Sequence, residues 1–250
     1  MGTVLGSNHG GSASAPAVHH EELLVLLHGL GGTGDIWVPG LEGHHDRWPG
    51  WWWAPDLAGH GTTGARLDGY TFGALAEDLA SRLPEARSYV VVGHSLGGVV
   101  GLGLAGLLPA VRRVVGLGIK VEWNDDELAG ARTMAERPVA WFDTEAEAVA
   151  RHRKVSGVGG LVDDEVARTG VVEEDGRWRL ALDPLTFAVG RPDMAGLLAE
   201  CPAEVVLARG ESDHMVSDAQ LRALVPAPVT LAGLGHNAHL EAPAVVLSLV

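Results

Sequence analysis

Short apolar runs alternate with longer mixed stretches along the first half of the chain. The runs are rich in β-branched residues and are bounded by Gly, Pro or charged positions, which is typical of buried parallel strands. The stretches between them are long enough for helices. This alternation predicts an α/β fold, with a mostly parallel central sheet and helices on both faces. The expected strands in this half are 23–27, 51–54, 89–92 and 114–119.

Two helices are expected between these strands, and further elements follow near the end of the chain. The stretches 73–83 and 98–108 each stop at a proline, as helices commonly do. Strand-like runs return at 204–208 and 229–231, so the sheet is expected to continue there. A last helix is expected from Pro243, and its shortness suggests a truncated C-terminus.

The pattern changes after residue 121. Stretches rich in Ala, Glu and Arg predict three further helices, and the dipeptide Asp175-Gly176 favours the tight turn of a small hairpin. The expected helices are 127–137, 145–154 and 163–168, the first two separated by Pro138 and Trp141-Phe142, and the hairpin arms are 171–174 and 177–182. Residues 121–195 are therefore interpreted as an insertion into the sheet domain.

The most informative segment reads Gly-His-Ser-Leu-Gly, from Gly93 to Gly97. It lies between an expected strand and an expected helix. A serine at such a corner projects its hydroxyl from the edge of the sheet, and the flanking glycines permit the crowded turn. In this context Ser95 is predicted to be a nucleophile rather than a turn serine.

Three other segments accompany it in a familiar order and spacing. The stretch 23–32 ends in His-Gly-Leu-Gly-Gly, 54–61 reads Ala-Pro-Asp-Leu-Ala-Gly-His-Gly, and 233–236 reads Gly-Leu-Gly-His. With the Gly-x-Ser-x-Gly segment, they make the chain resemble the α/β-hydrolase family from about residue 22 onward. The resemblance implies the α/β-hydrolase fold with a helical cap.

The resemblance also implies a domain organisation. Residues 22–120 and 196–250 would form the core, and residues 121–195 the cap, because the family commonly carries its cap at this place. Residues 1–21 are rich in Gly, Ser, Ala and His and lack the basic start and apolar run of a secretory signal. They are interpreted as a flexible leader, and the protein is expected in the cytoplasm.

The predicted nucleophile needs a base, because a serine hydroxyl barely ionises at neutral pH. Histidine suits this role, since its unperturbed pKa is about 6.5. His236 is predicted to be the base because it resembles the histidine of the family's late catalytic loop, and His239 is its rival. His94, beside the nucleophile, is expected to be a packing residue.

The base needs a carboxylate that fixes its tautomer and stabilises the imidazolium. Asp213 follows the strand-like run 204–208, where the resemblance places this acid, and the chain order Ser, Asp, His agrees with the family. Glu122 follows the strand expected at 114–119, a position from which some members draw the acid, and it is kept as the alternative. Glu211 is interpreted as a solvated loop charge.

The negative charge that develops on a substrate carbonyl oxygen must be met by hydrogen-bond donors. The resemblance implies the backbone N–H groups of Leu30 and Leu96 for this oxyanion hole. Apolar residues of the insertion are candidates for the substrate pocket, although packing between the cap helices explains them equally well. These candidates are Trp123, Met134, Trp141, Phe142 and Phe187.

Charge and composition limit the partners. The 250 residues are 46% hydrophobic and 20% charged, as in a globular domain, and the net charge of −14 argues against nucleic acid and disfavours an anionic membrane surface. One cysteine allows no intrachain disulfide, and no apolar run approaches the roughly 20 residues of a membrane span. Neither a metal nor a cofactor is expected. The expected partner is a small-molecule substrate, and the oligomeric state stays open.

Basic residues give no clear substrate signal. No cluster of Arg or Lys marks a carboxylate or phosphate site, although Arg132, Arg137 or Arg191 could act singly. The leading hypothesis is a serine hydrolase that cleaves a carboxylic ester, or a lactone or thioester, of a small and fairly apolar molecule through an acyl-enzyme.

Two alternatives remain. The first is a C–C bond hydrolase or lyase of the menaquinone-synthase or ring-cleavage-product type, since such relatives use the same triad. An arginine placed to hold a substrate carboxylate would favour it. The second is a non-catalytic receptor for a small ligand, against which the intact serine, histidine and acid argue.

Overall fold

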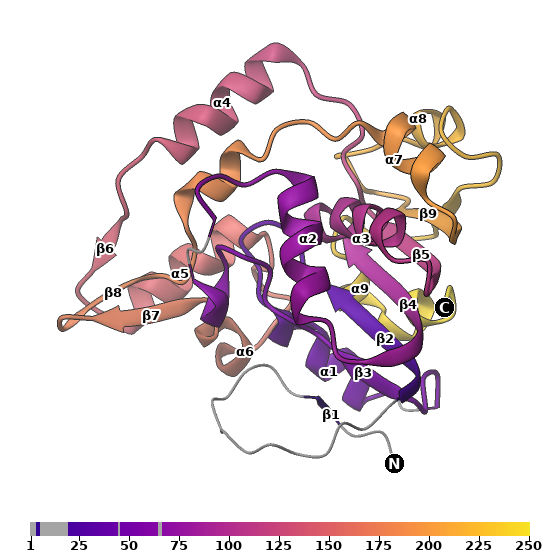
Figure 1. Cartoon of the computed structure of the whole chain (residues 1–250). Helices are drawn as coiled ribbons and strands as arrows, with labels where there is room; N and C mark the ends of the chain where they lie inside the picture. Colours follow the sequence, from indigo (N-terminus) through magenta and orange to yellow (C-terminus); the bar gives the residue numbers. More distant parts are fainter. Residues whose placement is uncertain (1–3, 6–19, 45, 65–66) are drawn as a thin grey trace.

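The computed structural model describes residues 4–5, 20–44, 46–64 and 67–250. Within them, seven strands form one sheet in the order β1-β3-β2-β4-β5-β9-β10, and all neighbours are parallel (Figure 1). The strands are β1 (Val4–Leu5), β2 (His20–Leu27), β3 (Trp51–Trp53), β4 (Ala86–His94), β5 (Val111–Leu117), β9 (Glu204–Gly210) and β10 (Val229–Leu231). The predicted parallel α/β architecture is confirmed.

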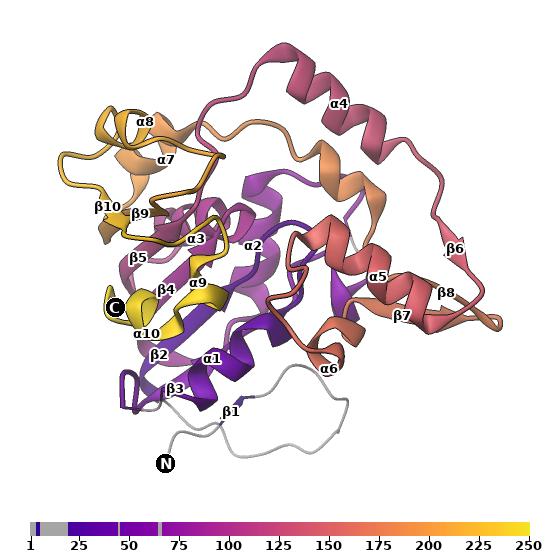
Figure 2. The same ribbon diagram turned by 180° about the vertical axis from the view of Figure 1, so that it is seen from behind.

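Helices cover both faces of this sheet (Figures 1 and 2). One face carries α2 (Phe72–Arg82), α3 (Leu96–Leu107), α7 (Met194–Glu200) and α8 (Asp218–Arg222). The other carries η1 (Gly34–Trp37), α1 (Val38–Glu42), α9 (Ala238–Glu241) and α10 (Pro243–Leu247). The short helix η2 (Gly61–Thr63) follows β3.

The central strands are buried on both faces, which explains their continuous apolar sequence. Leu24 and Leu26 of β2 point into the core beneath α1, whereas Leu23, Val25 and Leu27 point into the core beneath α3. All five side chains are fully buried. This two-sided core fixes the carboxyl ends of the strands, from which the loops of the candidate site extend.

The segment between β5 and α7 builds a separate layer at one end of the sheet (Figures 1 and 2). It contains α4 (Asp125–Ala135), β6 (Trp141–Phe142), α5 (Glu145–Ser156), α6 (Asp164–Arg168), β7 (Val171–Glu174), β8 (Arg177–Leu180) and η3 (Pro184–Ala188). Both longer helices begin with a capping box, formed by Asn124 with Glu127 and by Thr144 with Glu147. The helices predicted in this segment are present.

The predicted hairpin is present as β7 and β8, and both turn residues, Asp175 and Gly176, have positive φ angles of 52° and 78°. One element of this segment was not predicted. Trp141-Phe142, which separates two helices as expected, also forms β6 and pairs antiparallel with β8. The two-residue length of this strand left no periodic pattern to detect.

The stretch expected to be a flexible leader is described only in part. Val4–Leu5 forms β1, which pairs with β3 at the sheet edge, and His20 already begins β2. Residues 1–3 and 6–19 of that expectation lie outside the described residues. None of the helices in the described part of the chain has the length and hydrophobicity of a transmembrane segment.

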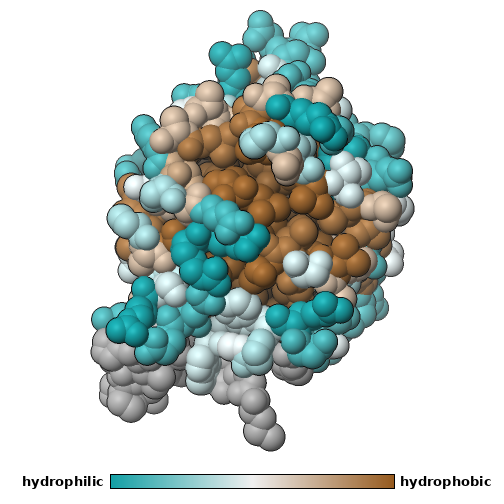
Figure 3. All heavy atoms as spheres, turned by 90° about the vertical axis from the view of Figure 1, so that its right-hand side faces the viewer, coloured by the Kyte–Doolittle hydropathy of each residue, from teal (hydrophilic) through white to brown (hydrophobic). Residues whose placement is uncertain are grey.

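One side of the molecule, which lies to the right in Figure 1, has a largely apolar surface. Figure 3 shows a broad apolar area inside a polar rim on this side. Half-buried side chains of β9, β10 and the C-terminus, including Val206, Val229 and Val250, pack against the buried core.

Candidate active site

Ser95 lies at the corner between β4 and α3 in a backbone conformation that residues other than glycine rarely adopt. Its φ and ψ angles are 49° and −113°, and in the described chain only Asp175 shares a positive φ among residues other than glycine. A Cβ on Gly93 would lie 2.3 Å from the Gly97 carbonyl oxygen, and one on Gly97 would lie 2.5 Å from that of Leu27. The two glycines are therefore required by the crowding around this strained serine.

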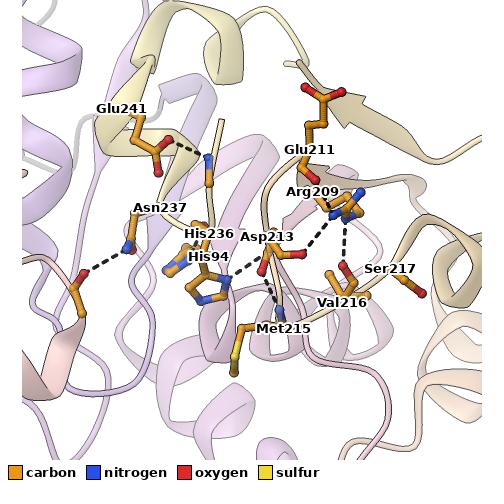
Figure 4. Close-up of polar contacts among 12 residues, drawn as sticks. His94, Arg209, Glu211, Asp213, Met215, Val216, Ser217, His236, Asn237 and Glu241 are labelled. Carbon is orange, nitrogen blue, oxygen red and sulfur yellow. Dashed lines mark hydrogen bonds and ion pairs between the residues drawn. The ribbon is translucent and has the colours of Figure 1, made fainter. Parts of the chain in front are cut away.

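His236 and Asp213 meet at the same edge of the sheet, although 23 residues separate them. Asp213 follows β9 and His236 follows β10, and these neighbouring parallel strands end side by side. The Nδ1–H of His236 donates to Oδ2 of Asp213 at 3.0 Å (Figure 4). With Nδ1 used in this bond, Nε2 is the nitrogen left free to accept a proton.

Asp213 is held as a carboxylate. Its side chain is fully buried, and burial alone disfavours the charged form. The hydrogen bonds from His236 and from the Met215 N–H, the latter 2.8 Å from Oδ1, outweigh this effect and lower the pKa of Asp213. Arg209 fixes the loop by donating to the carbonyl oxygens of Asp213 and Val216 (Figure 4).

The alternative acid, Glu122, lies elsewhere. Its Oε2 accepts a hydrogen bond of 2.8 Å from the side chain of Gln220 at an exposed position. The rival base, His239, is buried between Trp37 and His94, with ring centroids 4.6 and 4.3 Å away. The structure therefore brings Asp213 to His236 and neither Glu122 nor His239 into that pair.

His94 supports the loop of His236 by packing, as expected. Its Nε2–H donates to the His236 carbonyl oxygen at 3.1 Å, and the two rings pack edge to face with centroids 4.6 Å apart. Burial lowers the pKa of His94 well below its ordinary value, so the ring stays neutral.

The first glycine-rich loop is fixed by His28. Its Nδ1–H donates to the Gly29 carbonyl oxygen at 2.8 Å, and its Nε2 accepts from the Leu57 N–H at 3.0 Å. Because both ring nitrogens are used, the buried side chain is neutral and its orientation is fixed. Burial also lowers the pKa of His28. This arrangement positions the turn that contains Leu30.

A cavity of about 260 Å³ lies above these residues. Ser95, His236, Leu30 and Leu96 all line it, so the predicted nucleophile, base and oxyanion-hole residues face one space. Most of the remaining lining is apolar and comes from both the sheet domain and the insertion. These residues include Ile36, Phe72, Val99, Ile119, Val155, Val158, Val189, Pro192 and Met215.

The predicted pocket residues divide into three groups. Trp123 and Phe187 line this cavity. Met134 lines a smaller adjoining cavity, whose wall also includes Phe187. Trp141 and Phe142 line neither cavity; they lie in β6, where the guanidinium groups of Arg177 and Arg179 lie about 6 Å from the Trp141 ring centroid.

Three further features of the cavity and its surroundings were not predicted. Lys120 lies 4.9 Å from the Trp123 ring centroid and pairs with Glu127. Asn237 is buried beside His236. Gly118 has a φ of 62°, and a Cβ there would lie 3.1 Å from both Asp213 Oδ2 and His236 Nδ1. Proximity to the expected strand end and to His236 was the only sequence signal for these residues.

The site offers no evident metal centre. Within the described residues, no group of three or more His, Cys, Asp or Glu side chains is arranged to hold a metal ion. The buried histidines instead have lowered pKa values because of burial, about 3 for His60 and His239 and about 4 for His152. Ser95, His236 and Asp213 supply a hydroxyl, an imidazole and a carboxylate at this site.

Comparison with known sequences gives a consistent match. The sequence model of the Alpha/beta hydrolase family matches residues 24–249. A protein of Yersinia enterocolitica named putative carbamate hydrolase RutD is 40% identical over 87 residues, which are 33% of this chain and 30% of that protein. The alignments with the first curated relatives span between 30% and 39% of their lengths.

Solved structures share the whole architecture. A crystal structure of E-2-(acetamidomethylene)succinate hydrolase has a TM-score of 0.74 at 23% identity and covers 92% of this chain and 91% of that chain. A thioesterase domain from the curacin biosynthetic pathway has a TM-score of 0.71 at 20% identity and covers 92% and 90%. At these identities the likeness shows a common fold.

Proposed function

Because this chain belongs to the alpha/beta hydrolase family, we propose that it is a serine hydrolase that cleaves a carboxylic ester of a small, largely apolar molecule. Ser95 is the nucleophile, His236 the general base and Asp213 the acid that orients it. The observation that carries this proposal is the 3.0 Å bond between Asp213 and His236, which share one edge of the sheet with Ser95.

The proposed reaction has two halves. His236 Nε2 takes the proton of the Ser95 hydroxyl as its oxygen attacks the ester carbonyl carbon. The tetrahedral intermediate collapses, the alcohol leaves with the proton from His236, and the acyl group remains on Ser95. Water then attacks the acyl carbonyl, His236 takes its proton and returns it to Ser95, and the carboxylic acid is released.

The oxyanion would be held by the N–H groups of Leu30 and Leu96. Leu96 opens α3, so its N–H has no acceptor inside the helix, and helix N-termini favour negative charge. In the described part of the chain, neither N–H donates a hydrogen bond. Losing one such donor typically costs about 3 to 4 kcal/mol of barrier.

The lining of the cavity supports the substrate class. Apolar side chains dominate its walls, and a volume of about 260 Å³ suits a small acyl group. We propose that the insertion, residues 121–195, acts as a cap, because Val155 and Phe187 from this segment face the same space as Ser95. Lactones and thioesters would react by the same route. We keep the cytoplasm as the expected compartment.

A second candidate is carbamate hydrolysis. The Yersinia relative, which matches this chain over 87 residues, is named a putative carbamate hydrolase, and this name favours the reaction. A carbamate carbonyl would be attacked by the same serine. Cleavage of a C–C bond also remains open, because it would use the same three side chains. Turnover of carbamate and β-diketone substrates, measured beside esters, would rank these reactions.

The direct test uses an activated-serine probe and a chromogenic ester. A fluorophosphonate should label the wild type, and 4-nitrophenyl butyrate should be hydrolysed. Ser95→Ala should abolish both signals, whereas Ser81→Ala, at an exposed position on α2, should keep them. Labelling or turnover that persists in Ser95→Ala would remove the serine hydrolase assignment. Absence of both in the folded wild type would favour the receptor alternative.

A further inference from the structure

Most arginines of this acidic protein have carboxylate partners. Ten of those described form ion pairs with Asp or Glu, and Arg209 donates to three backbone carbonyls. Four described arginines have no acidic partner: Arg132, Arg137, Arg151 and Arg191. The residues outside the described ranges include no Asp or Glu, so they supply none either. In a chain of net charge −14, unpaired arginines are exceptions.

Two of these exceptions share one cavity. Arg137 and Arg151 line the adjoining space of about 80 Å³, together with Met134, Leu180 and Leu182, and no carboxylate lines it. Arg151 is half-buried. Partial burial weakens the hydration of the Arg151 guanidinium group, and Arg137 is an exposed residue that lines the same space without a counter-ion. An external anion would satisfy them.

This cavity adjoins the catalytic one. Val155 and Phe187 line both cavities, so the two spaces share these side chains. Arg151 and Val155 are four residues apart on α5, one helical turn, so they lie on the same face about 6 Å apart along the axis. Arg137 reaches the same space from the segment after α4.

We propose that Arg137 and Arg151 bind a carboxylate at the far end of the substrate's acyl group, with the scissile carbonyl at Ser95. The acyl chain passes between Val155 and Phe187, and the guanidinium groups receive its terminal carboxylate in a fork geometry. The preferred substrates are therefore half-esters of dicarboxylic acids. This inference rests on the proposed function for the bond that is cleaved, and on the arginine pair for the end that is recognised.

The test compares acidic and neutral esters of equal chain length. Mono-4-nitrophenyl adipate and suberate are paired with 4-nitrophenyl hexanoate and octanoate. The ratio of kcat/KM, acidic over neutral, is expected to exceed one in the wild type for at least one pair. It is expected to fall about tenfold in Arg137→Gln and in Arg151→Gln, mainly through KM, and further in the double variant. Arg132→Gln removes an equally unpaired charge on α4 outside the cavity and keeps the ratio.

A binding measurement separates this inference from the proposed function. Adipate is titrated calorimetrically into Ser95→Ala and into the same variant carrying Arg151→Gln. If adipate binds to Ser95→Ala but not to the variant that also carries Arg151→Gln, and the wild type hydrolyses no ester, the anion site is upheld and the ester hydrolase is rejected. Turnover of neutral esters with a ratio that neither arginine changes, and no adipate binding, would reject the anion site and leave the hydrolase intact.

Discussion

The side-chain amide of Asn237 donates a hydrogen bond of 3.1 Å to the carbonyl oxygen of Gly157 (Figure 4). Asn237 directly follows His236, and Gly157 is the left-handed C-cap of α5, with a φ of 72°. Both residues line the catalytic cavity. One bond therefore connects the loop of the proposed base with the inserted segment.

Asn237→Ala is expected to loosen this connection. A typical intramolecular hydrogen bond contributes about 1 kcal/mol, so we expect kcat/KM for 4-nitrophenyl butyrate to fall roughly fivefold. Amide hydrogen exchange should increase at the C-terminal end of α5. Asn124→Ala removes the cap of α4 instead and should raise exchange only there. If amide hydrogen exchange around residue 157 is unchanged in Asn237→Ala, this hydrogen bond does not hold the C-terminal end of α5 in place.

The identity of the acid is tested by a pair of amide substitutions. Asp213→Asn removes the charge and the acceptor at the 3.0 Å bond to His236, and we expect kcat to fall by about 10⁴, as for other triads. Glu122→Gln changes a residue bonded to Gln220 at the surface and should leave kcat unchanged. Steady-state kinetics of both variants decide the matter, and the opposite ranking would transfer the role to Glu122.

The local patterns of the sequence predicted much of this architecture. The buried strands were predictable because both faces of each strand need apolar residues, as at Val90–Val92. The corner at Ser95 was predictable because its flanking glycines are a steric requirement that the sequence records directly. The Asp175-Gly176 turn was predictable because it likewise depends on neighbours in sequence.

Contacts between distant segments were not predictable in this way. No local pattern groups Arg137 with Arg151, because only the packing of α5 against the segment after α4 brings them to one cavity. Trp141 was a candidate for the pocket by composition, yet its pairing in β6 directs it to Arg177 and Arg179.

Gly118 provides the space for the Asp213–His236 pair. A Cβ at this position would lie 3.1 Å from atoms of both side chains, and its φ of 62° disfavours any other residue. We expect Gly118→Ala to lower kcat at least tenfold while the protein stays folded. Ester kinetics measure kcat, and circular dichroism checks the fold. Gly130→Ala, on α4 with open space around it, should retain full activity. Equal activities of the two variants would contradict this role.

Trp123 and Trp141 make a matched pair for the substrate pocket. Trp123 lines the cavity and its Nε1–H donates to the Lys120 carbonyl oxygen, whereas Trp141 is 38% exposed in β6. Trp123→Ala enlarges the cavity and should shift the optimum of a 4-nitrophenyl acyl-chain series by about two carbons towards longer chains. Trp141→Ala should leave the optimum in place. A shift in Trp141→Ala alone would mean that β6 forms part of the pocket.

Buried histidines should make the fold sensitive to acid. His28, His60, His94, His152 and His239 are neutral in the folded protein, because burial lowers the pKa of each below the ordinary value of 6.5. Above pH 6.5 neither state gains a proton, and the full stability is present. Below it the unfolded chain binds protons that the folded chain excludes, so the free energy of unfolding decreases as pH falls towards the folded pKa values. The lowered pKa of Asp213 adds a further loss only below about pH 4, near its ordinary value.

His239 offers the sharpest test, because neither of its buried ring nitrogens has a hydrogen-bond partner among the described residues and its folded pKa is about 3. Each such histidine contributes a slope of up to about 1.4 kcal/mol per pH unit below its unfolded pKa. Urea unfolding at pH 7.5 and 5.5 should therefore show His239→Phe losing about 1 to 1.5 kcal/mol less than the wild type, since phenylalanine binds no proton in either state. His214→Gln, at an exposed position, should match the wild-type loss. An equal loss in His239→Phe and in the wild type would mean that His239 is protonated in the folded protein at pH 5.5.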